Sequence, residues 1–270
     1  MPEYGNIDVA LAGLQIGVNA TRVDGTFIAQ ETIGFGSPVM SYGGQDNKCW
    51  GAHQDQLVAT MNQALASSDV LSLVINGTAF TKTGTGTSDT DMIAYVAAIN
   101  ANTAMIALNI TASLTGSSAY RTITLKAIGV DLTVVVSCTP YNTDGLTFTG
   151  VYSTWASFLG VALFNQRGGR DYGAGQSSTD GVIPSSGGTN GYMKYEAVNI
   201  LSVGRVWVVV AASTENFLDS AYLIFGTGAT QNQFTNVASA TANKAITGRV
   251  FMTSKNSQGL AILSVNDIVQ

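Results

Sequence analysis

Apolar residues in this chain come in short runs, and glycine, serine, asparagine or aspartate closes each run. Runs of this length are typical of β-strands, whereas an amphipathic helix needs a longer segment with a 3.6-residue period. Several runs are almost continuously apolar, which suits strands covered on both faces. The clearest lie at residues 33–40, 71–75, 122–125, 132–136, 158–164, 206–210, 222–225 and 260–265. We therefore predict a mainly β fold, either jelly-roll-like or a β-sandwich or barrel.

Residues 68–141 follow a different pattern. Asn76-Gly77 separates two strand-like runs, at residues 70–75 and 78–81, and this dipeptide favours the type I′ turn of a β-hairpin. Ser88, Asp89 or Thr90 can cap a following helix, which carries Met92, Val96 and Ile99 on one face. Further strands are expected at residues 121–126 and 132–137, joined around Gly129. The order hairpin, helix, strand, strand predicts a small α+β unit with its own core.

The segments on either side of this unit resemble each other, because both are rich in glycine and in strand-like runs. We therefore predict one discontinuous β domain made of residues 1–56 and 146–270. The α+β domain, residues 68–141, is then inserted in a surface loop, where insertions are well tolerated. Two or three domains in series are the alternative.

Charged residues are scarce. They make up 11% of the 270 residues, against about 25% in typical soluble domains, and the net charge is −5. No run of Lys and Arg could neutralise a series of phosphates, which argues against direct binding of nucleic acid. Most of the surface must then be Ser, Thr, Asn, Gln and Gly, as expected of a protein that packs against other subunits.

The first ten residues, MPEYGNIDVA, lack the basic and apolar regions of a secretory signal. The longest strongly apolar run, residues 206–212, is far shorter than the ~20 residues of a membrane span. We therefore expect a chain that is made in a cytoplasm, stays soluble and has no membrane partner.

The residues that carry enzyme or metal chemistry are few. His53 is the single histidine, and it follows Cys49 at C-x-x-x-H spacing. A zinc site would need two further ligands, and Cys138 is the only other cysteine, so we interpret His53 as a surface-loop residue and both cysteines as buried free thiols. No Gly-x-Ser-x-Gly motif supplies a nucleophile. We predict no catalytic residues, no metal and no cofactor.

A protein that binds or cleaves glycans remains an alternative. Acidic residues of the C-terminal part could form a pair across a cleft, and aromatic residues could form a carbohydrate platform, although such aromatics more often lie in cores or interfaces. The acidic residues are Asp171, Asp180, Glu196, Glu215 and Asp219, and the aromatic ones are Trp155, Tyr172, Tyr192, Tyr195 and Trp207.

The order of several motifs carries a resemblance. Phe158-Leu159-Gly160 is followed by Gly204-Arg205-Val206-Trp207-Val208, by Asn232-Gln233-Phe234, and by Gly248-Arg249-Val250 with Gly259-Leu260-Ala261. Residues 33–39, IGFGSPV, form an early strand of the same kind. In this order the chain resembles the structural cement, or head decoration, proteins of tailed bacteriophages. The resemblance covers residues 1–56 and 146–270, and residues 68–141 depart from it.

The resemblance implies a non-enzymatic virion protein on the outer surface of the mature phage head. It would clamp neighbouring subunits of the major capsid protein and associate with itself, as a homotrimer by preference or as a homodimer. Another virion part, such as a tail-tube, sheath-associated or head-fibre protein, is the alternative. The candidate contacts form two sets. One is an N-terminal segment that could be an arm or a first strand, with Tyr4, Ile7, Val9, Leu11, Leu14 and Ile16; the other is the loop of residues 167–189, with Arg167, Arg170 and Tyr172.

Overall fold

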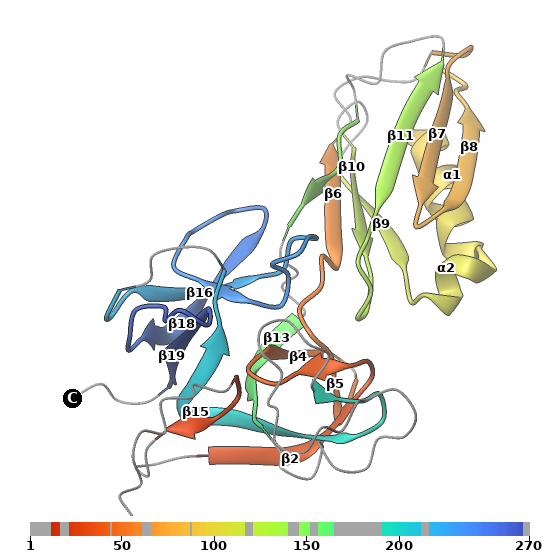
Figure 1. Ribbon diagram of the computed structural model, residues 1–270. Helices are drawn as coiled ribbons and strands as arrows, with labels where there is room; N and C mark the ends of the chain where they lie inside the picture. Colours follow the sequence, from red (N-terminus) through yellow and green to blue (C-terminus); the bar gives the residue numbers. More distant parts are fainter. Residues whose placement is uncertain are drawn as a thin grey trace, which may run out of the picture. The chain divides into compact units, whose positions relative to one another are not determined.

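The computed structural model describes residues 12–16, 22–43, 45–60, 66–86, 88–116, 121–139, 146–151, 156–164, 191–211 and 216–266. The contacts between its residues divide the chain into two compact units (Figure 1). Unit 1 comprises Met1–Ala52, Thr154–Ser239 and Asn243–Gln270, and unit 2 comprises His53–Ser153 and Ala240–Ala242. Strands predominate over helices, so the predicted mainly β fold is confirmed.

Unit 1 is built on a ten-stranded sheet that curls into a nearly closed, barrel-like form (Figure 1). Two further strands of unit 1, β3 and β14, have two residues each and pair with each other in a separate small sheet. The strands of unit 1 are β1 (Gln15–Ile16), β2 (Arg22–Ala29), β3 (Ile33–Gly34), β4 (Pro38–Tyr42), β5 (Lys48–Cys49), β13 (Ala156–Ala162), β14 (Gly191–Tyr192), β15 (Ala197–Val209), β16 (Ser220–Ile224), β17 (Phe234–Thr235), β18 (Asn243–Phe251) and β19 (Leu260–Val265).

Strand β15 joins the two halves of this sheet. Its first half pairs with β2, from Ala197 opposite Ile28 to Val203 opposite Arg22. Its second half pairs with β19, from Gly204 opposite Val265 to Val209 opposite Leu260. On the other side, β13 pairs with the first half and β1 with the second. Thirteen residues of one strand therefore hold both halves of unit 1 in register.

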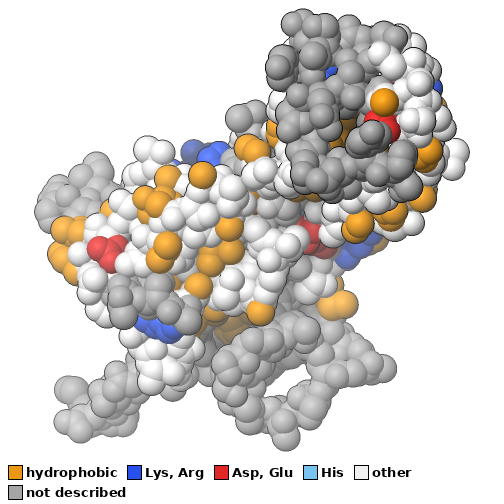
Figure 2. Space-filling model, turned by 90° about the horizontal axis from the view of Figure 1, so that it is seen from above, with side chains coloured by type: hydrophobic (Ala, Val, Ile, Leu, Met, Phe, Trp, Pro, Cys, Tyr) orange, Lys and Arg blue, Asp and Glu red, His pale blue; other side chains and the backbone are white. Residues whose placement is uncertain are grey.

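Among the described residues on the face drawn in Figure 2, most atoms belong to uncharged polar side chains or to the backbone. Hydrophobic side chains appear there in small groups, and Lys, Arg, Asp and Glu are few. This agrees with the low charge content of the sequence.

Unit 2 has two antiparallel sheets and two helices. One sheet has the order β12-β6-β10-β9 and the other β11-β7-β8. Its elements are β6 (Gln56–Thr60), β7 (Val70–Ile75), β8 (Thr78–Thr83), α1 (Ser88–Ala101), α2 (Thr103–Ala107), β9 (Thr111–Thr115), β10 (Thr122–Lys126), β11 (Val134–Thr139) and β12 (Thr149–Gly150).

The hairpin of unit 2 forms as predicted. β7 and β8 pair from Ile75 opposite Thr78 onward, and Asn76 and Gly77 between them have φ values of 45° and 82°. Both residues therefore take the left-handed conformation that a type I′ turn requires. The predicted helix is also present, and Met92 and Ile99 on its predicted face are fully buried.

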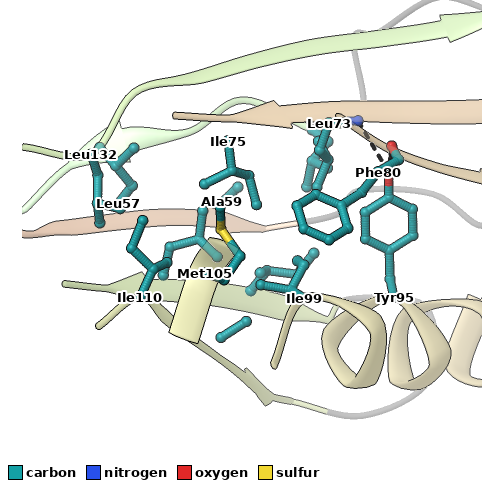
Figure 3. Packing of buried hydrophobic residues seen from close by; sticks show 14 of the residues in the cluster. Leu57, Ala59, Leu73, Ile75, Phe80, Tyr95, Ile99, Met105, Ile110 and Leu132 are labelled. Carbon is teal, nitrogen blue, oxygen red and sulfur yellow. Dashed lines mark hydrogen bonds between the residues drawn. The ribbon is translucent and has the colours of Figure 1, made fainter. Parts of the chain in front are cut away.

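The core of unit 2 lies between the strands and α1 (Figure 3). Alternate residues of β7 and β10 are buried, so each strand turns one face to this core. Tyr95 of α1 carries its hydroxyl into the core, where it accepts a hydrogen bond from the Leu73 amide at 3.0 Å and contacts the carbonyl oxygens of Leu71 and Phe80. One side chain thus ties the helix to both strands of the hairpin.

The two strands expected after the helix are present, but they belong to different sheets. β10 pairs with β6 and β9, whereas β11 pairs with β7. Residues 56–60 and 111–115 also form strands of this unit, β6 and β9, and the sequence patterns did not identify them.

Candidate functional site

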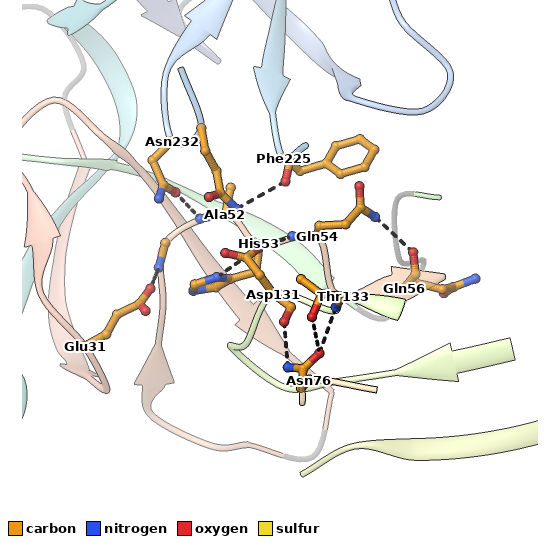
Figure 4. A network of polar contacts seen from close by, with 12 residues as sticks. Glu31, Ala52, His53, Gln54, Gln56, Asn76, Asp131, Thr133, Phe225 and Asn232 are labelled. Atoms are coloured by element: carbon orange, nitrogen blue, oxygen red, sulfur yellow. Dashed lines mark hydrogen bonds and ion pairs between the residues drawn. The ribbon is translucent and has the colours of Figure 1, made fainter. Parts of the chain in front are cut away.

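The single histidine has a structural partner inside unit 2. The His53 side chain is 12% exposed, and its Nδ1 lies 3.4 Å from Oδ1 of Asp131. The same carboxylate oxygen accepts a hydrogen bond from the Gln54 amide at 2.7 Å, and the Asp131 carbonyl accepts one from the Asn76 side chain at 2.9 Å (Figure 4). His53 does lie in a loop, as predicted, but its side chain is not at the surface, because it packs against the segment that carries Asp131.

Side chains also fix the backbone where the chain leaves unit 1. The Gly51 amide donates to Oε1 of Glu31 at 2.6 Å, and the Ala52 amide donates to Oδ1 of Asn232 (Figure 4). Glu31 and Asn232, like Asp131 beside His53, accept hydrogen bonds from backbone amides, so their role is structural.

Both cysteines are free thiols, as predicted, but only Cys49 is also buried as predicted. Cys49 is fully buried, and burial, reinforced by Glu31, raises its pKa to about 12. Cys138 is only partly buried, and burial again raises its pKa. A raised pKa leaves little of the reactive thiolate at neutral pH, so neither thiol is activated as a nucleophile. Among the residues that the structure describes, no three His, Cys, Asp or Glu side chains gather in a group that could hold a metal ion.

The two described acidic residues of the glycan hypothesis close turns in unit 1. An Asp219 carboxylate oxygen accepts from the Asn216 amide at 2.8 Å and from the Asn236 side chain at 2.7 Å, and these hydrogen bonds lower the pKa of Asp219. A Glu196 carboxylate oxygen accepts from the Met193 amide at 2.7 Å. Asp171, Asp180 and Glu215 lie outside the described residues.

The three described aromatic residues of that hypothesis differ widely in exposure. Tyr192 is buried, donates its hydroxyl to the Leu163 carbonyl at 2.9 Å, and packs edge-on against Phe35. Burial raises its pKa. Tyr195, in contrast, is 70% exposed, and Trp207 is half-buried. Trp155 and Tyr172 lie outside the described residues.

Two of the predicted contact residues, Leu14 and Ile16, lie in the described part of unit 1. Both are half-buried, and Ile16 pairs with Arg205 in the sheet. The Trp207 amide donates to the Leu14 carbonyl at 3.0 Å. At these residues the chain is a strand of its own domain. The other contact candidates lie outside the described residues, namely Tyr4, Ile7, Val9, Leu11, Arg167, Arg170 and Tyr172.

Nine large hydrophobic side chains are more than 40% exposed in the described part of the chain, and no sequence pattern marked them as a group. In unit 1 they are Val23, Met193, Tyr195, Phe217, Leu218 and Val237; in unit 2 they are Ile93, Ile106 and Val135. Phe217 and Leu218 share one turn, and Met193 and Tyr195 share another. Since these four residues lie in turns, no periodicity reveals them.

Residues from three of the sequence motifs that carry the family resemblance contact one another inside unit 1. The guanidinium of Arg249 in β18 lies 5.3 Å from the ring centre of Phe158 in β13. The Phe158 ring in turn packs edge-on against Phe234 of β17, with 6.4 Å between ring centres. Burial lowers the pKa of Arg249. Residues from three of the sequence motifs therefore build one cation–π and aromatic cluster in the sheet.

A comparison with protein-family models finds a match. The family model "Structural cement protein (E217 gp24/Pam3 gp6)" matches residues 115–266, which is more than half of the chain and includes all three residues of the cluster. The match begins within the segment that we predicted to be an insert and does not include residues 1–56. No curated protein matches the chain.

A search of the described residues finds no helix that is both long and apolar enough to cross a membrane.

The chain belongs to the family of structural cement proteins, and it is therefore a structural component of a phage virion that associates with capsid proteins.

Proposed function

We propose that this protein binds the outer surface of the mature phage head and clamps neighbouring subunits of the major capsid protein, without catalysing a reaction. The observation that carries the proposal is the family match over residues 115–266. The location on the head and the clamping are our extension of that family membership.

The physical character of the chain supports this role. A β-sheet whose strands pair over large sequence separations gives a rigid scaffold, as β15 does in unit 1. A surface poor in charge suits contacts that are made by shape and by uncharged polar groups. Modest contacts of this kind become strong when many copies act on one repeating lattice.

We further propose that the protein is a homotrimer, with a homodimer as the alternative, because closed symmetry matches the local axes of a capsid. The N-terminal segment and the loop of residues 167–189 remain our candidates for contacts with capsid subunits or with other copies. The pairing of Ile16 with β15 restricts a free arm to the residues before Gly13, since the Gly13 amide already donates to the Trp207 carbonyl at 2.7 Å.

The glycan alternative receives less support than the capsid role. A binding platform needs exposed aromatic rings on a common surface, and Tyr192 is buried in the core. Glu196 and Asp219 are each engaged by backbone amides of their own turns.

The copy number of this chain relative to the major capsid protein in purified virions tests the proposal. A ratio near one, or near a simple symmetric fraction of one, is the expected result. A handful of copies per particle would instead indicate a tail or fibre protein. Absence from the particles would contradict any role in the virion.

A further inference from the structure

Left-handed backbone conformations single out two residues of unit 1. Seven non-glycine residues in the described part of the chain have a positive φ, and five of them are asparagine, the residue that tolerates this conformation best after glycine. The other two are Tyr195, with φ 75°, and Leu218, with φ 69°. Bulky side chains are disfavoured there, so each position carries local strain.

The two residues occupy the same place in two turns of the same design. In Met193–Glu196 and in Asn216–Asp219, the first amide donates to the carboxylate of the fourth residue, at 2.7 and 2.8 Å. The fourth amide donates back to the first carbonyl, at 3.1 and 3.2 Å. The third residue has the positive φ, a position at which turns usually carry glycine or asparagine.

A third turn closes with the same two hydrogen bonds but has neither a bulky residue nor a positive φ. In residues 66–69 of unit 2 the Ala66 amide donates to Asp69 at 2.8 Å, and the Asp69 amide donates to the Ala66 carbonyl at 3.0 Å. Its central residues are Ser67 and Ser68, both exposed, and neither has a positive φ. The large apolar residues of the other two turns therefore need an explanation outside turn formation.

Both strained turns present apolar side chains to solvent. Tyr195 is 70% exposed, and Phe217 and Leu218 are 59% and 48% exposed. Backbone hydrogen bonds fix each tip, since the Tyr195 amide donates to the Ala29 carbonyl and the Leu218 amide to the Phe251 carbonyl, both at 2.7 Å. The tips are thus displayed on a rigid frame.

The two tips are anchored to different strands of unit 1, one beside the Ala29 carbonyl of β2 and the other beside the Phe251 carbonyl of β18. Glu196 directly precedes β15, whereas Phe251 reaches Val206 of β15 through Leu263 of β19. About ten residues of β15 therefore lie along the path through the sheet that connects the two anchoring strands. Because each turn has its own anchoring strand, we treat the two tips as two contact points.

We propose that the turns at Met193–Glu196 and Asn216–Asp219 are two apolar contact points that insert into depressions on major capsid protein subunits. This inference rests on the proposed function and names the parts of the molecule that carry it. We take the capsid protein as the occupant, because the chain belongs to a family of structural cement proteins, which associate with capsid proteins. Retained strain and exposure together are expected of residues kept for binding.

The test uses heads purified from a phage mutant that lacks this chain, to which purified full-length protein is added back. Leu218→Asn and Tyr195→Asn replace each apolar side chain with the residue that the turn favours. Ile93→Gln, on an exposed position of α1 without strain, is the matched control. Bound copies are measured against free concentration by sedimentation and mass spectrometry, and thermal midpoints are measured for each variant.

We expect each turn variant to bind at least about tenfold more weakly, the size of effect seen at interface hot spots. Their thermal midpoints should be equal to or above that of the wild type, because asparagine relieves the strain. Wild-type affinity in both turn variants, or an equal loss in Ile93→Gln, would overturn the inference. If the wild-type protein itself fails to bind heads, the proposed function fails first and the inference falls with it.

Discussion

Two side chains link the stability of the fold to pH in opposite directions. Tyr95 is buried in unit 2, and burial raises its pKa to about 12. Asp219 lies at the surface of unit 1, and hydrogen bonds from Asn236 and Asn216 lower its pKa. A raised pKa on an acid favours its neutral form in the folded state, whereas a lowered one favours its charged form.

For Tyr95, the contribution to stability is complete below the pKa of an unfolded tyrosine, near 10, and is lost as the pH rises towards 12. Tyr95→Phe removes the hydrogen bonds to β7 and β8 and should cost about 1–3 kcal/mol at pH 7. The difference in unfolding free energy between wild type and variant should shrink between about pH 10 and 12. Urea unfolding measured across that range checks this, and a constant difference would contradict it.

For Asp219, the contribution is present above the unfolded pKa of about 3.9 and is lost as the pH falls through the lower folded value. Asp219→Asn should therefore lower the thermal midpoint at pH 7 and have a smaller effect near pH 3. Asp46→Asn, at an exposed position of the same unit, makes the same change in charge and serves as the control. An equal midpoint shift in both variants would show that the hydrogen bonds of Asp219 do not matter.

For single residues, the sequence predicts roles that depend on neighbouring residues in the chain. It does not predict roles that depend on partners far away in the chain. Asn76-Gly77 marked its turn because both residues favour the conformation of the turn itself. The roles of Tyr95 and Asp131 depend on partners from other elements, and these partners are brought together only by folding.

Strand pairing in unit 1 depends on one close approach between β13 and β15. A Cβ atom added at Gly160 would lie 2.1 Å from the Leu201 carbonyl oxygen, which is a backbone atom that cannot move aside. Gly160→Ala should therefore destabilise unit 1 by about 3 kcal/mol, at the upper end of overpacking effects, or prevent its folding. Gly43→Ala is the control, because a Cβ atom added at Gly43 would meet nothing within 4 Å. Soluble expression and thermal unfolding distinguish the two, and equal stability would refute the close approach.

The elements most visible in the sequence were those with regular burial. The 92–99 helix and the strands at residues 71–75 and 260–265 were found because their apolar residues follow a period or a continuous run. The first half of β15 was missed, since its apolar residues are interrupted by Asn199 and Ser202. Its strand conformation is imposed by β2 and β13 on either side.

At the scale of the whole molecule, deleting the predicted insertion tests where the domain boundaries lie. Deleting residues 53–153 and joining the ends through a short Gly-Ser linker should leave unit 1 folded. The narrower deletion of residues 68–141 keeps β6 and β12 but removes β10, which pairs with β6. It exposes the buried Leu57 and Ala59, so we expect it to aggregate.

Circular dichroism and cooperative thermal unfolding report on both deletions. A folded β spectrum for the 53–153 deletion is the expected result. Loss of that spectrum would mean that unit 1 does not fold independently, and the two-domain organisation would have to be abandoned.

The low charge of the molecule predicts how its attachment to heads responds to salt. Few Lys, Arg, Asp and Glu side chains are available for ion pairs across an interface. Raising the ionic strength from about 0.05 to 0.5 M shortens the screening length and should weaken binding to heads less than about threefold. Quantitative add-back at several salt concentrations measures this, and a steep loss would point to a charged interface instead.

Because strands early in the chain pair with strands late in the chain, the early strands must wait for their partners during synthesis. Tyr42 of β4 pairs with Ala156 of β13, 114 residues later, and β2 waits longer still for β15. At about 5–20 residues per second, a ribosome needs roughly 6–23 s to cover that interval. All of residues 53–153 emerge within it. The middle of the chain can thus fold while β2 and β4 still lack their late partners, β15 and β13. Until those strands are made, β2 and β4 leave strand edges open, and such edges can pair with other nascent chains on the same mRNA.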